Sequence, residues 1–407
     1  MNKVILFVML FLSMLLLTSC WSKKELTDIA IVSALGVDLD GDGRYVGTIQ
    51  VVNPGNVAGG QQGGGNNSYG PPVNVYSETG NNLVEISKKF STKISRRLYY
   101  AHTNLVVVGE RLAREEGILH ILDAMDRDPE FRITSVVVIA QDTAAKDLLR
   151  TLTPIDKLPS NKVIKTLKST EKNWGSHLEV NMKDVINDLV SEGKEPLITG
   201  FGVRGEINQA MKLENLQETT PEAILQAEGI AVFKDGKLVD WLQDDTARGS
   251  LWILDKIQET DLNIDWEGKV DAIAYEVIRQ NTKVSSTTQQ GKPMINVEVQ
   301  AEGEIGEVEV PIDLTNPHLL LRIETEIEKE IKKEIQEAIK QIQANKSDVF
   351  GFGEVVHQSD PKLWKKIKAD WNDVYFPDLQ VDVKVNSFVR RSGLRSKSFL
   401  SEMKENR

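Results

Sequence analysis

The first twenty residues limit what the rest of the chain can fold into. Lys3 precedes a segment from Val4 to Leu17 that is apolar except for Ser13, and the only cysteine of the chain, Cys20, follows closely. Because a membrane span needs roughly 20 apolar residues, this pattern predicts a secretory signal peptide over residues 1–19. An exported chain with one cysteine cannot form an internal disulfide, so its fold has to rest on hydrophobic cores.

The four residues from Leu17 to Cys20 resemble the lipobox of bacterial lipoproteins, which has a large apolar residue three positions before the cysteine and a small residue directly before it. The resemblance implies cleavage between Ser19 and Cys20, a diacylglyceryl thioether on Cys20 and an acyl group such as palmitate on the new amino terminus. Two or more acyl chains anchor a protein stably, whereas one chain of myristoyl size holds it only marginally. The alternative is an ordinary thiol at the edge of an anchor that is kept.

The length and the net charge of the chain limit the number of domains and the classes of partner. Without its first 19 residues, the chain of 407 is long enough for two or three domains at roughly 150 residues each. It has 60 Asp and Glu against 49 Lys and Arg, a net charge of −11. Nucleic acid requires clustered Lys and Arg, so we expect no nucleic-acid partner. We also expect that charge does not draw this acidic chain to anionic lipid, so the lipid on Cys20 has to provide the anchoring.

Strands and helices alternate after the cysteine, which predicts an N-terminal α/β domain over residues 20–150, with a mixed sheet covered by helices. We expect strands at 29–37, 45–52, 73–77, 105–108 and 131–140, and helices at about 82–95, 110–125 and 143–149. Between residues 53 and 72 the sequence NPGNVAGGQQGGGNNSYGPP offers almost nothing to bury. A flexible surface loop is therefore expected there.

Two further domains complete the expected multidomain α+β fold. Residues 151–220 carry short amphipathic helices near 162–168 and 182–190 and a strand at 196–203, which indicates a small middle domain. Residues 221–407 predict a C-terminal α+β domain with an antiparallel sheet and one long helix. It begins with a hairpin around the type I′ signal Asp235-Gly236. After it we expect a helix at 246–258, strands at 269–288 and 292–310, helices at 317–345 and 361–371, and a strand at 379–390.

Several stretches, spread over nearly the whole chain in the right order, carry a family resemblance. The segments CWSKKELTDIAIVSALGVD, RRLYYAHTNLVVVGERLAREEGI and DRDPEFR resemble the first domain of the Ger(x)C family, the C-subunit lipoproteins of spore nutrient germinant receptors. The segments DWLQDDTARGSLWILDKI and VFGFGEVVHQSDPKLWKKIKADWNDVYFPDLQVDVKVNSFVRRSGL are similar to its last domain.

The resemblance implies a function and a location. It points to a spore-forming Gram-positive bacterium and to the outer face of the spore inner membrane, with the cell membrane as the other membrane to which lipid would hold the chain. It implies a complex with two integral membrane subunits in a receptor that senses amino acids, sugars or nucleosides and triggers germination. No enzymatic activity is attributed to this subunit, so we expect no catalytic residues, metal or cofactor.

Other motifs indicate structure rather than chemistry. Gly200, Gly202 and Gly205 spell GxGxxG, but an exported chain meets no nicotinamide cofactor, and a bent strand is the preferred interpretation. The segment from Asp38 to Gly43 matches the first half of a calcium loop, but the twelfth position is Ile49 instead of a bidentate glutamate, so a hairpin turn is favoured. The histidines are scattered and no pair has metal-binding spacing.

Two helices carry apolar patterns with two interpretations each. Isoleucines recur at a mean step near four in 319–343, which predicts a broad stripe that covers a sheet, with partner docking as the alternative. Trp364 and Trp371 lie seven residues apart on the expected helix 361–371, so both indoles can face one surface. We expect them in the core beside the last strand; an exposed patch for a membrane subunit is the alternative.

The sequence therefore predicts a lipid-anchored, non-enzymatic subunit of a nutrient germinant receptor. The alternative function is an extracellular solute-binding lipoprotein that itself binds an amino acid or a sugar. The residues do not indicate a nutrient ligand, and they do not exclude one.

Overall fold

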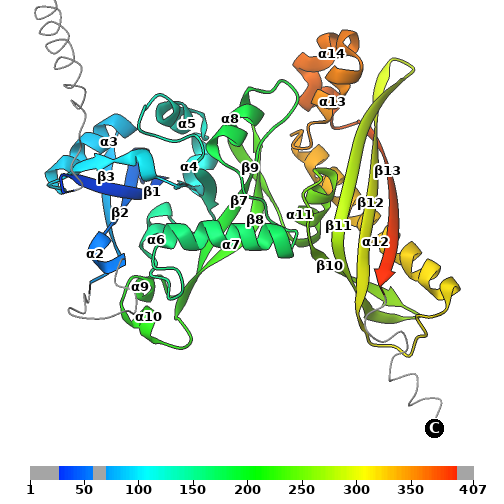
Figure 1. Cartoon of the computed structure of the whole chain (residues 1–407). Coiled ribbons are helices and arrows are strands. Elements are labelled where there is room, and N and C mark those ends of the chain that lie inside the picture. The colour runs from blue at the N-terminus through cyan, green and yellow to red at the C-terminus, as the bar shows by residue number, and fades with distance from the viewer. Residues whose placement is uncertain (1–26, 58–69, 392–407) are drawn as a thin grey trace, which may run out of the picture.

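Two β-sheets, with helices packed on and between them, make up the computed structural model, which describes residues 27–57 and 70–391 (Figure 1). The fold is mixed α+β, as expected. In Figure 1 the first sheet lies on the left and centre and the second sheet on the right, with α11 between them.

The first sheet contains nine strands of the described residues in the order β3-β2-β1-β5-β6-β7-β8-β9, with β4 beside β1. Strands β1, β5, β6 and β7 pair in parallel, and the strands added at either end are antiparallel to their neighbours. The bounds are β1 Ile29–Leu39, β2 Tyr45–Val52, β3 Val73–Gly80, β4 Arg97–Tyr99, β5 Leu105–Gly109, β6 Val136–Ala140, β7 Leu197–Gly205, β8 Ala223–Lys234 and β9 Lys237–Leu242.

Helices cover both faces of the first sheet. Strands β5 and β6, with the sequences LVVVG and VVVIA, are buried at every position, as is typical of parallel strands between two helical layers. One face packs on α3 (Leu83–Lys89), α4 (Glu110–Glu115), α5 (Leu119–Asp126) and α8 (Met182–Val190). The other packs on α6 (Ala145–Arg150) and α7 (Pro159–Asn173). Short helices α2 (Pro54–Val57), α9 (Ile207–Ala210) and α10 (Glu214–Gln217) lie in the connections.

The second sheet has the order β10-β11-β12-β13, with bounds β10 Thr260–Trp266, β11 Lys269–Gln289, β12 Lys292–Val308 and β13 Gln380–Arg391. Its first three strands are antiparallel, as expected, but β13 pairs in parallel with β12, which corrects the expectation of a wholly antiparallel sheet. The chain between them is a helical crossover, the connection that parallel neighbours require. Its elements are α12 (Pro317–Asn345), α13 (Phe352–Ser359), α14 (Pro361–Ile367), a 3₁₀ turn (Lys368–Asp370) and a π-turn (Trp371–Tyr375).

The core of the second part lies between its sheet and the helices α11 (Asp244–Ile253) and α12. The isoleucine stripe of α12 faces this core, which confirms the interpretation as a core helix. Its buried members are Ile323, Ile327, Ile331, Ile335, Ile339 and Ile342.

The expected middle domain 151–220 does not form a unit of its own. Its strand β7 pairs with β6 on one side and with β8 on the other, so the first sheet crosses both expected boundaries. The hairpin β8–β9, which was expected to open the C-terminal domain, is the last pair of strands of the first sheet. Hydrophobic periodicity shows where a strand lies but not which distant segment it pairs with, and this is why the boundaries were misplaced.

Three elements differ from the expectation. The expected helix 110–125 is two helices, because Gly117 has a φ of +84° and a side chain there would meet the carbonyl oxygen of Gly236. The expected helix 82–95 ends at Lys89 and continues only as a 3₁₀ turn to Thr92. Strand β10 was not expected.

The expected flexible loop 53–72 is described only at its two ends. The Asn53 N–H donates to the Pro72 carbonyl oxygen at 2.9 Å, which closes the base of the loop beside α2. Residues 58–69 lie outside the described part of the chain, so the expected flexibility stays a prediction.

Candidate functional site

The residues expected to carry the lipid come before the described part of the chain. Ser19 and Cys20 both lie outside it, so cleavage and lipid attachment at these positions stay predictions. The described chain begins at Thr27 and enters β1 two residues later. None of the described helices is long and apolar enough to cross a membrane.

The metal-like and nucleotide-like motifs take ordinary structural roles. Asp40 Oδ1 accepts hydrogen bonds from the backbone N–H groups of Asp42 and Arg44 at 3.0 and 2.9 Å, so this carboxylate closes the turn between β1 and β2. The GxGxxG segment lies on β7, whose pairing with β8 shifts register between Thr199 and Phe201. Both preferred interpretations are confirmed. Among the described residues, no group of three or more His, Cys, Asp or Glu side chains is placed to hold a metal ion.

Hydrogen bonds, ion pairs and apolar contacts between segments far apart in the sequence meet where the first sheet adjoins the C-terminal elements, a region that we call the joint. Its centre is apolar. Leu178, Leu197, Ile230 and Val232 come from the first part and are buried in the same continuous core as the second sheet and α12. The two parts therefore share one core, and rotation of one against the other would expose apolar surface to water.

A buried carboxylate organises one side of the joint. Asp348 is fully buried and follows α12. Its Oδ2 accepts hydrogen bonds from the Gly353 N–H at 2.7 Å and from Trp371 Nε1 at 2.8 Å, and its Oδ1 accepts one from the Phe352 N–H at 3.1 Å. Burial raises the pKa of Asp348 to about 6, although these donors favour the charged form. The carboxylate thus ties the start of α13 to the tryptophan that follows α14.

Glu195 continues this network into the first part. It precedes β7 and is 8% exposed. Its backbone N–H donates to the Asp348 carbonyl oxygen at 2.8 Å, and its Oε1 accepts hydrogen bonds from Asn372 Nδ2 at 3.1 Å and from the Asp235 N–H at 3.3 Å. Burial raises the pKa of Glu195 to about 7. One side chain therefore joins the β8–β9 turn to the segment after α14.

Ion pairs and backbone contacts surround these two carboxyl groups. Lys234 pairs with Asp373 at 2.6 Å, and Lys368 pairs with Glu192 at 2.6 Å, each across the joint. The backbones approach closely between them: a side chain on Gly353 would lie 2.8 Å from the Cα atom of Gly193. This close approach explains why glycine is needed in the segment VFGFGE.

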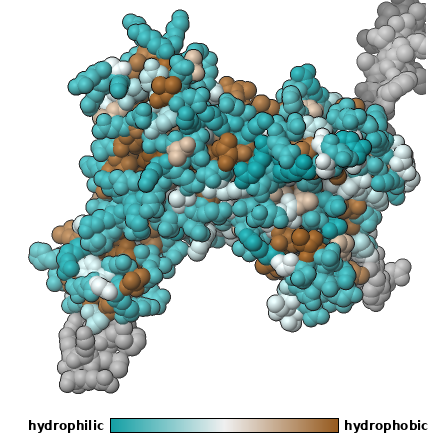
Figure 2. Space-filling model, turned by 180° about the vertical axis from the view of Figure 1, so that it is seen from behind, coloured by the Kyte–Doolittle hydropathy of each residue, from teal (hydrophilic) through white to brown (hydrophobic). Residues whose placement is uncertain are grey.

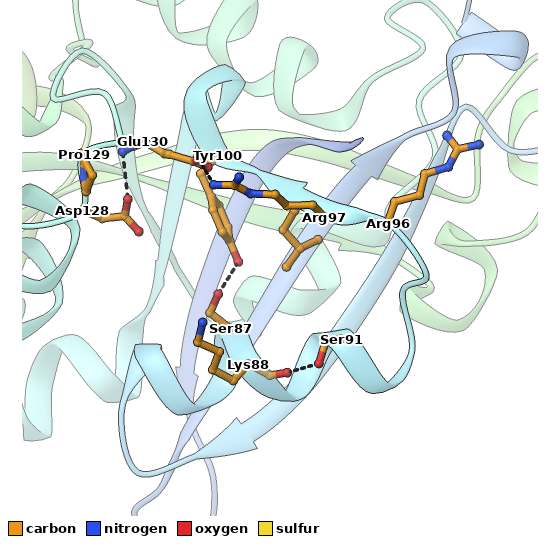
Figure 3. A pocket seen from close by; sticks show the side chains of 10 residues that line it. Ser87, Lys88, Ser91, Arg96, Arg97, Tyr100, Asp128, Pro129 and Glu130 are labelled. Carbon is orange, nitrogen blue, oxygen red and sulfur yellow. Dashed lines mark hydrogen bonds and ion pairs between the residues drawn. The ribbon is translucent and has the colours of Figure 1, made fainter. Parts of the chain in front are cut away.

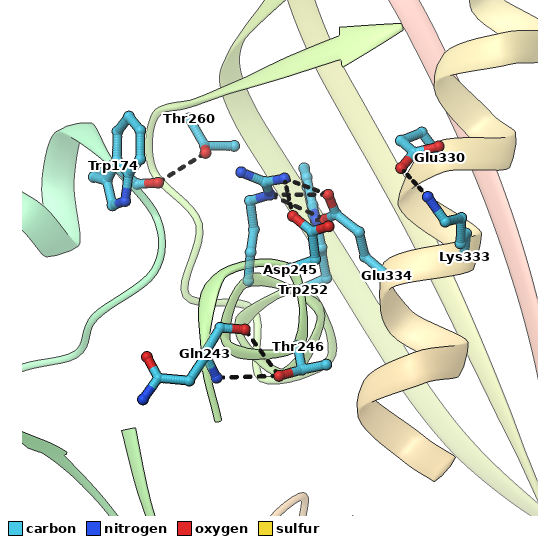
Figure 4. A network of polar contacts seen from close by, with 10 residues as sticks. Trp174, Gln243, Asp245, Thr246, Trp252, Thr260, Glu330, Lys333 and Glu334 are labelled. Carbon is cyan, nitrogen blue, oxygen red and sulfur yellow. Dashed lines mark hydrogen bonds and ion pairs between the residues drawn. The ribbon is translucent and has the colours of Figure 1, made fainter. Parts of the chain in front are cut away.

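The far side of the joint is held by amide and hydroxyl groups. Gln341 Nε2 and Asn345 Nδ2, near the end of α12, donate to Asp240 Oδ2 on β9 at 2.8 and 2.6 Å. Thr260 Oγ1 donates to the Trp174 carbonyl oxygen at 2.8 Å, between β10 and the end of α7 (Figure 4). Contacts on both sides of an apolar centre indicate a rigid connection.

The tryptophan pair lies inside the second part at the joint. Trp364 and Trp371 are each 2% exposed, and their rings meet edge to face at a centroid distance of 5.3 Å. Phe352 and Phe376 complete the cluster. The indoles are therefore in the core, as expected. The chain leaves the α-helix after Ile367, however, so the two rings are brought together by a 3₁₀ turn and not by one continuous helix.

A second buried carboxylate locks α11 to α12. Glu334 is 1% exposed; it pairs with Arg248 and accepts a hydrogen bond from Trp252 Nε1 at 3.0 Å, and Arg248 also reaches Asp245 (Figure 4). Burial raises the pKa of Glu334, and the guanidinium of Arg248 opposes that shift. The network is satisfied on both sides, so its role is structural.

The surface offers shallow pockets. One of about 390 Å³ lies between α3 and the segment 128–130, and Figure 3 shows its polar side chains, with Arg97 directed at Glu130. Another of about 390 Å³ lies at the joint, with Glu195 and Lys234 in its lining. On the face shown in Figure 2 the apolar residues form separate patches on a mainly hydrophilic surface.

Sequence comparisons match both parts of the chain. The family described as "Spore germination protein N-terminal domain" matches residues 22–203, and the family "Spore germination B3/ GerAC like, C-terminal" matches residues 228–393. The chain belongs to the GerAC-like family of spore germination proteins. The N-terminal match runs across residue 150, in agreement with the continuous first sheet.

The relatives extend over the whole length. The chain is 46% identical over 405 residues to spore germination protein KC of Bacillus subtilis (strain 168), which covers 99% of both chains. It is 24% identical over 377 residues to spore germination protein B3 of the same organism, covering 91% of this chain and 93% of the relative. Among solved structures, the GerBC protein matches with a TM-score of 0.55 at 19% identity, over 88% of this chain and 97% of that one, and supports the fold.

Sequence reasoning missed the joint. Glu195 and Asp348 did not stand out, because single acidic residues in polar segments are ordinarily exposed. The available signal was the glycine-rich run Gly351 to Gly353 just after Asp348, since glycines at a helix boundary indicate a close backbone approach.

Proposed function

We propose that this chain is a lipid-anchored, non-enzymatic subunit of a spore nutrient germinant receptor, needed for nutrient-triggered germination. The chain is cleaved between Ser19 and Cys20, and Cys20 carries the lipid. The chain lies at the outer face of the spore inner membrane or of the cell membrane. Its partners are the two integral membrane subunits of the receptor. The observation that carries this proposal is the 46% identity over 99% of the chain to spore germination protein KC.

The architecture supports a scaffolding role. Two parts that share one core, with ion pairs and buried carboxyl groups across their joint, hold a fixed distance between distant surfaces. A subunit of this kind acts by positioning its membrane partners, and it needs no reacting groups. The sequence before β1 supplies the matching attachment, because the apolar segment Val4–Leu17 ends three residues before the only cysteine.

The lipid attachment is tested by replacing the acceptor. Cys20→Ala should give a folded precursor that is neither cleaved behind Ser19 nor acylated, because no thiol is present to modify. Ser19→Ala is the matched control, since it keeps a small residue before the cysteine and should be processed normally. Mass spectrometry gives the mature mass, and fractionation after a high-salt wash gives the membrane-bound share.

Spores that carry Cys20→Ala as their only copy should respond poorly to nutrients, whereas the Ser19→Ala spores should respond normally. If the Cys20→Ala chain stays membrane-bound at the mature mass, the proposed anchor is wrong. Calorimetry of the chain without residues 1–20 tests the solute-binding alternative: saturable micromolar binding of an amino acid or sugar would replace the scaffold function by that one.

A further inference from the structure

The attachment point of the chain restricts which surface can meet the membrane. Asp28 comes eight residues after Cys20, and at roughly 3.6 Å per extended residue the two Cα atoms lie within about 29 Å of each other. The Asp28 carbonyl oxygen accepts a hydrogen bond from the Arg97 N–H at 3.0 Å, and β4 pairs in parallel with the first residues of β1. The segment that leads into β4 is therefore fixed to the point where the tether ends.

That segment is basic in an acidic chain. From Ile86 to Gly109 there are five Lys and Arg and no Asp or Glu. We call these five side chains the basic surface; they are Lys88, Lys89, Lys93, Arg96 and Arg97. Three of them are neutralised by acidic neighbours: Lys89 by Glu85, Lys93 by Glu78 and Arg97 by Glu130, at 2.7 to 2.8 Å.

The other two cations of the basic surface are exposed and available. Lys88 and Arg96 have no acidic partner among the described residues, and both line the pocket beside Ser87 and Ser91. Figure 3 shows Arg96 directed away from the pair of Arg97 and Glu130. Val84, one turn before Lys88 on α3, is 68% exposed and adds an apolar side chain to the same region.

Charge then decides the orientation of a tethered body. The chain carries −11 in total, so its net charge is repelled by an anionic lipid surface. A Lys or Arg side chain is attracted to such a surface within about one Debye length, roughly 8 Å at physiological salt. On a short tether, the lowest free energy is reached when the unpaired cations next to the attachment point face the phosphates.

We propose that the basic surface lies against anionic phospholipid headgroups, with Lys88 and Arg96 contacting phosphate, and that this contact sets the orientation of the first sheet on the membrane. The inference rests on the proposed attachment at Cys20. The lipid holds the chain at the membrane, and the basic surface selects which side faces it.

The only cysteine permits a test that does not depend on bacterial lipidation. The chain from Cys20 onward is coupled through its thiol to a maleimide phospholipid in vesicles of phosphatidylcholine with or without phosphatidylglycerol. Lysine acylation is then followed residue by residue by mass spectrometry. We expect acylation of Lys88 to slow several-fold on the phosphatidylglycerol vesicles only, with recovery at 1 M salt, where the Debye length is about 3 Å. Lys362 and Lys365, exposed on α14, should react equally on both vesicles.

Paired variants sharpen the test. In the unmodified chain, Lys89 and Lys93 should also be acylated more slowly on anionic vesicles, because they belong to the basic surface. The double variant Lys88→Glu with Arg96→Glu should abolish this slowing. The double variant Lys362→Glu with Lys365→Glu changes the net charge equally and should leave the slowing in place. Equal acylation of Lys88 on both vesicles would overturn the inference and leave the proposed function untouched. Failure of lipidation in cells would overturn the proposed function, while the thiol-coupled chain still reports which surface meets the lipid.

Discussion

The strands of the two sheets are buried to different extents, because helices cover both faces of the first sheet and one face of the second. In the first sheet, β6 is buried at every position because helices cover both faces. In the second sheet, β12 alternates between buried and more exposed positions over most of its length, because α12 and its neighbours cover one face only. The open face carries charged and amide side chains in register, for example Lys283 opposite Glu298 and Glu298 opposite Lys384. A continuous apolar run therefore indicates a strand in a sheet that is covered on both faces. A strict alternation of apolar and polar residues indicates a sheet that is covered on one face.

The second sheet consequently has its core on one face, and the joint extends that core into the first part. Its single core face includes the tryptophan cluster and continues into the first part through Leu197 and Val232. We therefore expect substitutions to lower the stability most where the joint meets the core of the second sheet, and least on the open face of that sheet.

Trp371→Ala should cost roughly 3 to 5 kcal/mol, because it removes a buried indole and one of the donors to Asp348. Trp174→Ala, at a side chain that is 52% exposed, is the control and should cost far less. Circular dichroism during denaturant unfolding measures both. An unchanged unfolding midpoint for Trp371→Ala together with lost receptor assembly would show that the indole serves a partner and not the core.

The buried carboxyl groups of the joint give a pH dependence. Burial raises the pKa of Glu195 to about 7 and of Asp348 to about 6, so the folded chain binds these protons more tightly than the unfolded chain does. Stability should therefore fall as pH rises from about 4, where unfolded carboxyl groups titrate, to about 7. The contribution of Glu195 is on the order of 3 kcal/mol.

Glu195→Gln isolates that contribution. The amide mimics the protonated carboxyl and should flatten the loss of unfolding free energy between about pH 4 and pH 7. Glu298→Gln, on the open face of the second sheet, should leave the slope as it is in the unmodified chain. Identical slopes for all three chains would contradict the assignment of the pH dependence to the joint.

Neighbouring substitutions test the comparison of the sheets directly. On β6, Val137 and Val138 point to opposite covered faces, so Val137→Ala and Val138→Ala should each cost about 2 kcal/mol. On β12, Val297→Ala should cost a similar amount, but Glu298→Ala should change the unfolding free energy by less than about 0.5 kcal/mol. A large cost for Glu298→Ala would mean that a partner or a part of the chain covers the open face.

Patterns of neighbouring residues predicted most elements of this fold. The long helix at 317–345, the strands at 29–37 and 45–52 and the hairpin at Asp235-Gly236 follow from periodicity and turn chemistry, which act over a few residues. The break at Gly117 was missed, because the close approach of the distant Gly236 accompanies it. The short end of α3 was also missed. Glu195 and Asp348 became candidates only once the fold had brought residues 192–195, 235 and 348–373 together.

The sequence alone determined the family and the α+β composition, and it predicts the attachment at Cys20, because motifs and hydrophobic patterns are local properties of the chain. Only the tertiary structure decided that residues 151–242 complete the first sheet, that β13 lies parallel to β12 and that the two parts share one core. Strand pairing and the burial of a charged side chain depend on residues far apart in sequence. Strand pairing and charge burial contribute to the free energy of folding only once the chain has brought these distant residues together and excluded water from between them.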